Sequence, residues 1–439
     1  MKVAIIGTGY VGLPTGVGFA ALRHHVTCVD SDRGKISRLS NGDLPIFENG
    51  LEDIFMESLS AGKIEFTTSM EKGIAGADVV IITVGTPTDP TTHTIELKYV
   101  RQAADQLAKF LKKYAVIAVK STVAVGTCDE VEQIIRQRNP HAEFDVISMP
   151  EFLREGFAVH DFFNPDRIVV GTDSMRAKNV IGKLYEPLEK KSRILYVGRR
   201  SGEMIKYASN AFLAIKIHYI NEVANLCEKT GADIEEVALG IGMDSRIGDK
   251  FLKPGPGYGG SCFPKDTSAM VSMGRQNNTN LRLVEMAIAE NSKRKDEMAN
   301  RILDSLGGID SPKVAILGLA FKGGTDDCRE SPAIEIIEKL LGKGVKIVAF
   351  DPKAMANAKT LLGDNITYAT DACAAAKEAD LLVVATEWDE FGSLDLERIK
   401  ASIGRPKIFD MRNVIDANLA RKLGFSLYGI GKQWHGGGK

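Results

Sequence analysis

The residues best suited to catalysis in this sequence lie in a glycine- and proline-rich run at positions 251–266. Its repeated helix and strand breakers predict a loop, and glycines let a backbone approach a ligand closely. The run delivers Cys262, with Lys265 and Asp266 close behind. Because a nearby ammonium group favours the thiolate, we expect Cys262 to be a nucleophile rather than a small buried apolar residue.

Two further groups of polar residues are of the types that assist a cysteine nucleophile. Lys206 and Asn210 are four residues apart in a helix-forming stretch, so they share one helix face. A donor pair of this kind can stabilise a developing oxyanion, although a solvated helical pair is the ordinary alternative. Glu151 and Glu155 follow a predicted strand. One carboxylate is a candidate to activate water, and the other to contact the cofactor or cap a turn.

A dinucleotide fingerprint, Gly-Thr-Gly-Tyr-Val-Gly, occupies residues 7–12 between an apolar strand and a helical stretch. In this pattern Gly7 makes the turn, Gly9 admits the pyrophosphate and Gly12 lets helix and strand pack. Asp30 follows Gly12 by eighteen residues, at the end of the next predicted strand. Its carboxylate suits ribose hydroxyls and repels a 2′-phosphate, which favours NAD, although the nearby Arg33 leaves NADP open.

Short apolar runs separated by helical stretches predict the elements that position these residues. Ligands of open α/β sheets bind at the carboxyl ends of strands, so Thr86 and Thr122, which follow two such runs, are expected to touch cofactor or substrate. Two doubly wound α/β domains are the simplest interpretation. The predicted strands are residues 3–6, 26–29, 79–84, 116–119 and 146–147, then 314–317, 346–350, 381–385 and 407–409.

The middle of the chain has a different pattern, with much helix-forming sequence and few β-branched runs. We therefore predict an N-terminal domain over 1–200, a helical domain over 201–305 and a C-terminal domain over 306–439. The first central helix should run to Gly231, long enough to bridge two domains. Helices of this length also form subunit interfaces.

Composition excludes several classes of protein. The 56 Lys and Arg residues nearly balance 57 Asp and Glu, so no global field attracts nucleic acid or a membrane. The six cysteines lack paired CxxC spacing, so we expect neither a disulfide framework nor a metal site. The chain opens directly on a strand-like segment and has no apolar run of membrane-spanning length, which favours the cytoplasm.

Six ordered motifs give the chain a resemblance to a known family: GTGYVG, STVAVGT, PEFLREG, KYASNAFLA, GPGYGGSCFPKD and FKGGTDDCRESPA. Along essentially its whole length, the sequence resembles the UDP-glucose/GDP-mannose dehydrogenase family, and within it the UDP-glucose branch. The resemblance implies an NAD-binding Rossmann domain, a central helical domain that forms a homodimer or higher oligomer, and a C-terminal domain that binds the UDP-sugar.

The same resemblance implies a four-electron oxidation of UDP-glucose to UDP-glucuronate, with two NAD per sugar. The nucleophile would be Cys262, which would form a thiohemiacetal and then a thioester that water hydrolyses. Lys206 and Asn210 would stabilise oxyanions, and Asp266 would be a polar partner of the lysine or water. Glu151 would take part in hydrolysis, and Thr122 would help to place water or substrate.

The resemblance also implies two sets of ligand contacts, and Arg246 in the second set would reach the substrate of a partner subunit. The cofactor set is Gly7, Gly9, Tyr10, Val11, Gly12, Asp30, Lys35, Thr86, Thr122, Glu155, Lys265 and Arg329. The substrate set is Glu151, Phe152, Leu153, Arg154, Glu155, Lys206, Asn210, Arg246, Phe251, Leu252, Lys253, Pro254, Gly255, Tyr258, Gly259, Phe321 and Lys322.

Alternative functions differ in what they require of these residues. A β-hydroxyacid dehydrogenase needs neither Cys262 nor a second α/β domain, and an inactive nucleotide-sugar sensor would be expected to lose Cys262 or Lys206. GDP-mannose or another UDP-hexose remains open as substrate. Met149 and residues 160–163 depart from the family pattern, and these departures bear on sugar identity rather than on chemistry.

Overall fold

The computed structural model describes residues 1–89, 91–92, 94–189 and 191–432. Contacts divide the chain into two compact units, each built around one sheet. The first comprises Met1–Ser209 with Ser272–Asn278, and the second comprises Asn210–Val271 with the described residues from Thr279 onward.

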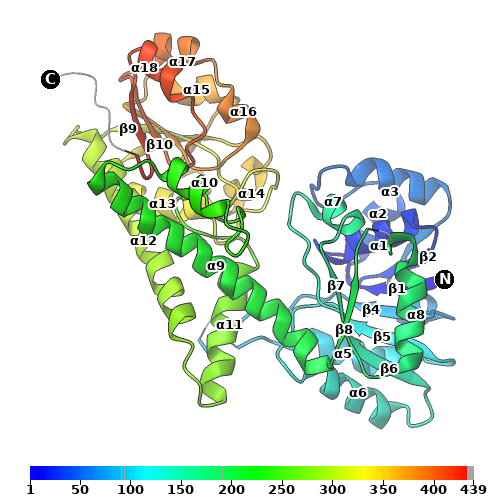
Figure 1. Ribbon diagram of the computed structural model, residues 1–439. Helices are drawn as coiled ribbons and strands as arrows, with labels where there is room; N and C mark the ends of the chain where they lie inside the picture. Colours follow the sequence, from blue (N-terminus) through cyan, green and yellow to red (C-terminus); the bar gives the residue numbers. More distant parts are fainter. Residues whose placement is uncertain (90, 93, 190, 433–439) are drawn as a thin grey trace. The chain divides into compact units, whose positions relative to one another are not determined.

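The sheet of the first unit has the order β3-β2-β1-β4-β5-β6-β7-β8 (Figure 1). Its first six positions follow the order typical of dinucleotide-binding folds, so the predicted doubly wound arrangement is confirmed. All neighbours are parallel except β6 and β7, which pair antiparallel. The strands are β1 Lys2–Ile6, β2 His25–Val29, β3 Ile64–Thr67, β4 Val79–Ile82, β5 Ala115–Val119, β6 Phe144–Ser148, β7 Ile168–Gly171 and β8 Ile194–Val197.

Helices bury apolar side chains against both faces of this sheet. Residues of α1, α3, α7 and α8 form one core cluster with the strands, and residues of α4, α5 and α6 form the other. The helices are α1 Gly12–Ala21, α2 Arg33–Ser40, α3 Leu51–Ser60, α4 Met70–Ile74, α5 Lys98–Ala108, α6 Thr127–Arg138, α7 Ala158–Phe163 and α8 Met175–Tyr185, followed by the short 3₁₀ helix η1 Glu186–Leu188.

The sheet of the second unit is parallel throughout and repeats the same strand order, β11-β10-β9-β12-β13-β14. The strands are β9 Lys313–Leu317, β10 Lys346–Phe350, β11 Thr367–Tyr368, β12 Leu381–Val384, β13 Lys407–Asp410 and β14 Ser426–Gly429. The helices are α13 Pro332–Leu341, α14 Met355–Leu362, α15 Ala372–Ala376, α16 Asp389–Gly392, α17 Leu396–Ser402 and α18 Ala417–Lys422.

Between the two sheets along the chain, the described residues form helices and no strand, which agrees with the predicted helical middle. The long helix α9 ends at Thr230, directly before the predicted Gly231, whose φ of 84° is the left-handed conformation that glycine adopts without strain. The boundary between the units falls inside α9. The four helices are α9 Arg199–Thr230, α10 Ile234–Gly242, α11 Phe263–Gln276 and α12 Arg282–Leu306.

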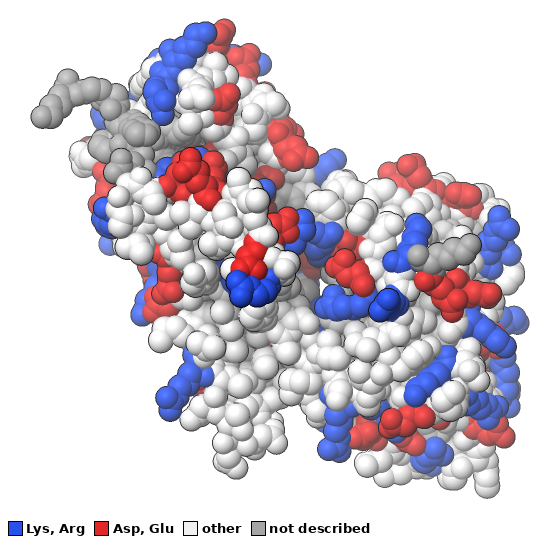
Figure 2. Space-filling view, viewed as in Figure 1, with Lys and Arg blue, Asp and Glu red and all other residues white. Residues whose placement is uncertain are grey.

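Acidic and basic side chains are interspersed on the face shown in Figure 2, in keeping with the net charge of -1. Within the described part of the chain, no helix is both long enough and apolar enough to cross a bilayer.

Candidate active site

The glycine loop between β1 and α1 has the geometry of a pyrophosphate cradle. A Cβ at Gly7, where φ is +102°, would lie 2.8 Å from the carbonyl oxygen of Thr83, and one at Gly12 would lie 2.0 Å from that of Gly7. A Cβ at Gly9 would meet nothing within 4 Å. The turn and the packing of α1 therefore require two of the glycines, while Gly9 borders open space where NAD phosphates fit.

Asp30, directly after β2, is an ionised carboxylate beside this loop. Its Oδ2 accepts hydrogen bonds from the backbone N–H and the hydroxyl of Thr8, at 3.0 and 2.6 Å, and forms an ion pair with Lys35 at 3.1 Å. Burial raises the pKa of Asp30, but the hydrogen bonds from Thr8, Asp32 and Lys35 outweigh it, so the net pKa lies below its ordinary value. An ionised acceptor at this point fits the ribose hydroxyls of NAD.

The turn after β9 in the second sheet resembles the β1–α1 turn, but the carboxylate beside it has different partners. Gly318 has a φ of +95°, and the carboxylate of Asp351 after β10 corresponds to that of Asp30. This carboxylate is 1% exposed and accepts hydrogen bonds from the backbone of Leu319, Ala320, Lys353 and Ala354 and from the indole of Trp388. Its acceptor positions are used by the fold, so the features that suit a dinucleotide belong to the first unit.

A buried ion pair joins two of the predicted catalytic residues in the first unit. The Nζ of Lys206, on α9, lies 2.8 Å from Oε1 of Glu151, in the loop after β6, and each side chain is 5% exposed. The other oxygen of Glu151 accepts the N–H of Leu153 at 2.6 Å. Next to the pair, the Phe152 ring packs under the guanidinium of Arg167 at 3.8 Å.

Lys120, which the sequence analysis did not single out, belongs to the same cluster. It directly follows β5, the neighbour of β6, and is 6% exposed. Burial lowers the pKa of Lys120 to about 8, with Glu151 opposing and Lys206 reinforcing that shift. Burial raises the pKa of Glu151, but the two lysines and the Leu153 N–H outweigh it and lower the net pKa. The sequence signal that could have identified Lys120 is its position at a strand end, just before Ser121 and Thr122.

The second unit joins another part of the predicted set around Asp266. This carboxylate, in the first turn of α11, accepts a hydrogen bond from Nδ2 of Asn210 at 2.6 Å and pairs with Lys265 at 2.5 Å, while its side chain is 1% exposed. Cys262 immediately precedes α11 and is partly exposed, with its Sγ 3.7 Å from the Ser261 hydroxyl. The thiol thus lies at the start of a helix whose first turn is fixed by a buried polar cluster.

The glycine-rich loop before Cys262 packs tightly within the second unit. A Cβ at Gly259 would lie 2.1 Å from the carbonyl oxygen of Glu330, and one at Gly260 would lie 2.8 Å from the Phe321 ring. The segment that follows β9, which contains the predicted contacts Phe321 and Lys322, is therefore in direct contact with this loop. In the loop, Lys253 is exposed, Phe251 is partly buried, and the remaining predicted contacts Leu252, Pro254, Gly255, Tyr258 and Gly259 are buried.

Three arginines predicted to bind ligand form ion pairs with neighbouring acids. Arg154 pairs with Asp161 at 2.6 Å, Arg329 with Asp327 at 2.7 Å, and Arg246 with Asp244 at 2.6 Å. Their side chains are 52%, 53% and 87% exposed. Their ligand roles remain predictions. So do those of the loop residues Tyr10, Val11, Thr86, Thr122 and Glu155 in the first unit.

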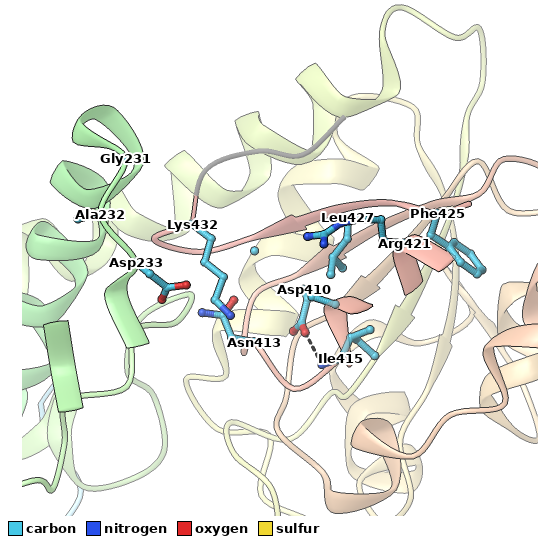
Figure 3. Close-up of a pocket in the computed structure, with 12 residues that line it drawn as sticks. Gly231, Ala232, Asp233, Asp410, Asn413, Ile415, Arg421, Phe425, Leu427 and Lys432 are labelled. Carbon is cyan, nitrogen blue, oxygen red and sulfur yellow. Dashed lines mark hydrogen bonds between the residues drawn. The ribbon is translucent and has the colours of Figure 1, made fainter. Parts of the chain in front are cut away.

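A pocket of about 400 Å³ lies elsewhere in the second unit, between the α9–α10 turn and the β13 and β14 region (Figure 3). The buried carboxylate of Asp410 lies in it and accepts the N–H of Ile415 at 2.7 Å, as the dashed line shows. None of the predicted site residues lines this pocket. Its walls are Gly231, Ala232, Asp233, Asp410, Asn413, Ile415, Ala417, Arg421, Phe425, Leu427, Gly429 and Lys432.

The six cysteines are all thiols, and Cys262 differs from the others in its surroundings. Four are buried: Cys28, Cys128, Cys227 and Cys328. Burial raises the pKa of each of these four and of the partly buried Cys373, that of Cys328 to about 12. They behave as small apolar residues.

The fold and the glycine loop with its acid define an α/β protein of the dinucleotide-binding class, with a second sheet of the same topology. Its domains match three family models in order: the NAD binding domain (residues 1–189), the central domain (200–293) and the UDP binding domain (315–417) of UDP-glucose/GDP-mannose dehydrogenases. The chain belongs to the UDP-glucose/GDP-mannose dehydrogenase family. The predicted resemblance and the predicted NAD cofactor are confirmed.

Individual relatives are similar over nearly the full length. The chain is 48% identical to a UDP-glucose 6-dehydrogenase of Rhizobium meliloti, over 98% of this chain and 100% of that one. It is 42% identical to UDP-glucose 6-dehydrogenase YwqF of Bacillus subtilis, over 99% and 98%. A solved UDP-glucose dehydrogenase from Pyrobaculum islandicum has a TM-score of 0.90 at 36% identity, over 98% of each chain.

Proposed function

We propose that this protein oxidises UDP-glucose to UDP-glucuronate with two NAD per sugar. The observation that carries the proposal is the full-length similarity to UDP-glucose 6-dehydrogenases. The partly exposed Cys262, at the end of a glycine-rich loop, supplies the thiol that a double oxidation uses.

In the proposed mechanism, the sugar C6 is oxidised twice, and its hydroxyl proton passes to solvent in the first oxidation. NAD, held by the glycine loop and Asp30, would supply the hydride acceptor each time. The aldehyde formed first is captured by the Cys262 thiolate, which restores a tetrahedral carbon that still bears hydrogen. The second oxidation converts this thiohemiacetal into a thioester. Lys206 and Asn210 donate to the oxygen that gains negative charge, and Glu151 takes a proton from the water that hydrolyses the thioester.

The proposed assembly is a homodimer that forms through α9, with the three-domain division at residues 200 and 305. Phe212, Tyr219 and Leu226 lie seven residues apart on this helix and therefore on one face, with exposures of 62%, 53% and 62%. A row of exposed large apolar side chains favours a protein partner, and a second copy supplies the same row. We also propose a cytoplasmic location, where cysteines stay reduced, because all six cysteines are thiols.

The test is to count NADH for each molecule of UDP-glucose consumed by the purified protein. We expect two NADH and a uronate product, and a ratio of one would contradict the double oxidation. The Cys262→Ser variant should lose at least about 99% of the turnover, as expected when a nucleophile is removed. Cys373→Ser, which changes a thiol elsewhere in the second unit, is the matched control and should retain full activity.

Sugar specificity is tested in parallel with UDP-galactose, GDP-mannose and UDP-N-acetylglucosamine. A solved UDP-D-ManNAc dehydrogenase from Pyrococcus horikoshii has a TM-score of 0.85 and 28% identity, so the fold alone is shared across sugars. We expect kcat/KM for UDP-glucose to exceed the others by at least about tenfold, since a site built to hydrogen-bond one hydroxyl pattern rejects others by more than that.

A further inference from the structure

Three buried polar side chains with no assigned role hold the glycine-rich loop ahead of Cys262. From α9, Oδ1 of Asn221 accepts the N–H of Gly255 at 2.8 Å. From α12, Nε of Arg294 donates to the carbonyl oxygen of Gly255 at 3.1 Å. Also from α12, Asn291 binds both backbone groups of Tyr258: its Oδ1 accepts the N–H at 2.8 Å, and its Nδ2 donates to the carbonyl oxygen at 3.0 Å.

The contact with Asn291 requires a carboxamide. Satisfying the N–H and the C=O of one residue needs an acceptor and a donor on the same short side chain, which asparagine supplies. The side chain is 8% exposed, so water does not readily replace either bond. The contact also needs a glycine in the loop. At Gly257, where φ is +115°, a Cβ would lie 2.8 Å from the Asn291 oxygen.

Asn291 and Arg294 together form a clamp on the loop, and Arg294 lies one turn further along α12. Its Nη1 donates to Asn225 on α9 at 2.6 Å and pairs with Glu297 at 3.0 Å, so its guanidinium is fixed on both sides while Nε holds Gly255. The residue is 5% exposed. Two helices and the loop are thus joined by one buried cation.

The clamp lies four residues before the thiol, and the loop between them has little freedom. Gly260 donates its N–H to the carbonyl oxygen of Arg329 at 3.0 Å, and Gly259 fits against Glu330 with no room for a side chain. A shift of the backbone at Tyr258 must therefore be passed on toward Cys262 or break these contacts.

We propose that Asn291, supported by Arg294, is a positioning residue for the reaction. It fixes the loop backbone at Tyr258 and Gly259 for the nucleotide sugar and sets the placement of the Cys262 thiol. The inference rests on the proposed function, in which this loop contacts the substrate and carries the nucleophile.

The Asn291→Asp variant tests the inference by its pH dependence. An ionised carboxyl group still accepts the Tyr258 N–H but repels the Tyr258 carbonyl oxygen, and protonation restores a donor. At pH 8 we expect KM for UDP-glucose to rise at least tenfold while KM for NAD stays within twofold. KM for UDP-glucose should fall back toward the wild-type value as the pH is lowered to 6.

A second readout does not depend on turnover. Without substrate, the rate at which iodoacetamide alkylates Cys262, followed by peptide mass spectrometry, should change at least threefold in Asn291→Asp. The matched control is Asn300→Asp, the same substitution at an exposed position of α12. If Asn291→Asp matches this control in both KM and alkylation, the positioning role is wrong.

If Asn291→Asp does not fold, Arg294→Lys is used, which keeps the charge but cannot make all three contacts. It should raise KM for UDP-glucose at least threefold, and an unchanged KM would overturn the inference. If the wild-type protein leaves UDP-glucose unoxidised, the proposed function fails, while a changed alkylation rate in Asn291→Asp would still support the clamp.

Discussion

Glu151 is a buried carboxylate whose charge is balanced by the ammonium groups of Lys206 and Lys120. Removing one partner of a buried ion pair leaves an uncompensated charge, which costs about 3–5 kcal/mol. We therefore expect Glu151→Gln to speed hydrogen exchange of peptides from β5 and β6 by at least about a hundredfold at pH 7, since about 1.4 kcal/mol is a factor of ten. Exchange followed by mass spectrometry measures this directly.

The effect should depend on pH with a defined sign. A carboxyl whose folded pKa is lowered contributes stability that is complete above its ordinary value of 4.5 and is lost as the pH falls through the folded value. The difference between Glu151→Gln and wild type should therefore shrink below pH 4.5. The control is Glu143→Gln, whose side chain is 69% exposed and pairs with Arg176, and which should cost at most about 1 kcal/mol. Equal effects of both variants would show that the buried ion pair does not stabilise the fold.

A motif in the sequence marks Cys262, Asp30 and Glu151 as candidate site residues, and their roles stay predictions. Asn291 and Lys120 were missed because their importance depends on tertiary contacts. Asn291 meets Tyr258 across 33 residues of chain, and an isolated asparagine in a helix has no distinguishing spacing. Nothing in a sequence indicates which backbone groups a distant side chain will satisfy.

Among the elements, the β1–α1 turn contains glycines in two different surroundings: Gly12 packs against the backbone of Gly7, and Gly9 borders open space. Gly9→Ala should leave the thermal midpoint within about 2 °C of wild type, because its methyl group enters open space in the ligand-free protein. The same methyl group would occupy the phosphate position, so Kd for NAD should rise at least about tenfold. Calorimetry measures both quantities.

The complementary variant in this turn is Gly12→Ala, whose methyl group would collide with the backbone of Gly7. Overpacking of this kind costs about 1–3 kcal/mol, so this variant should lower the thermal midpoint. If Gly9→Ala is the less stable of the two, the assignment of open space is wrong.

Sequence patterns located most of the central strands but missed the strands at the sheet edges and β7, which lies between β6 and β8. Five strands were not predicted: β3, β7, β8, β11 and β14. Most are partly exposed, such as β8 and β14, and none has more than four residues. A continuous apolar run is the signal of a strand buried on both faces, and β3 and β14 lack it, whereas β7 and β8 carry short apolar runs that the prediction left out. The predicted strand 79–84 proved two residues shorter because its end forms the loop that carries Thr86.

For the whole molecule, the exposed apolar row on α9 makes a prediction about assembly. Replacing Phe212 and Tyr219 together by aspartate should convert a dimer to a monomer, because each dimer would bury four carboxylates without partners. Light scattering coupled to size-exclusion chromatography gives the mass. The control is Met175→Asp, at a methionine of α8 that is 66% exposed and outside the row. A monomeric wild type, or a double variant that stays dimeric, contradicts the assignment.

The boundary between the two compact units falls within α9, between Ser209 and Asn210, rather than in a linker. A helix has no natural cutting point in its interior, because each turn is hydrogen-bonded to the next. Recombination with a relative of different sugar preference should therefore succeed at the loop after α12, near Gly307, and fail at residue 209. For this chain we therefore expect a new sugar preference to come from substitutions or from replacement of the C-terminal sheet alone, and not from an exchange of modules within α9.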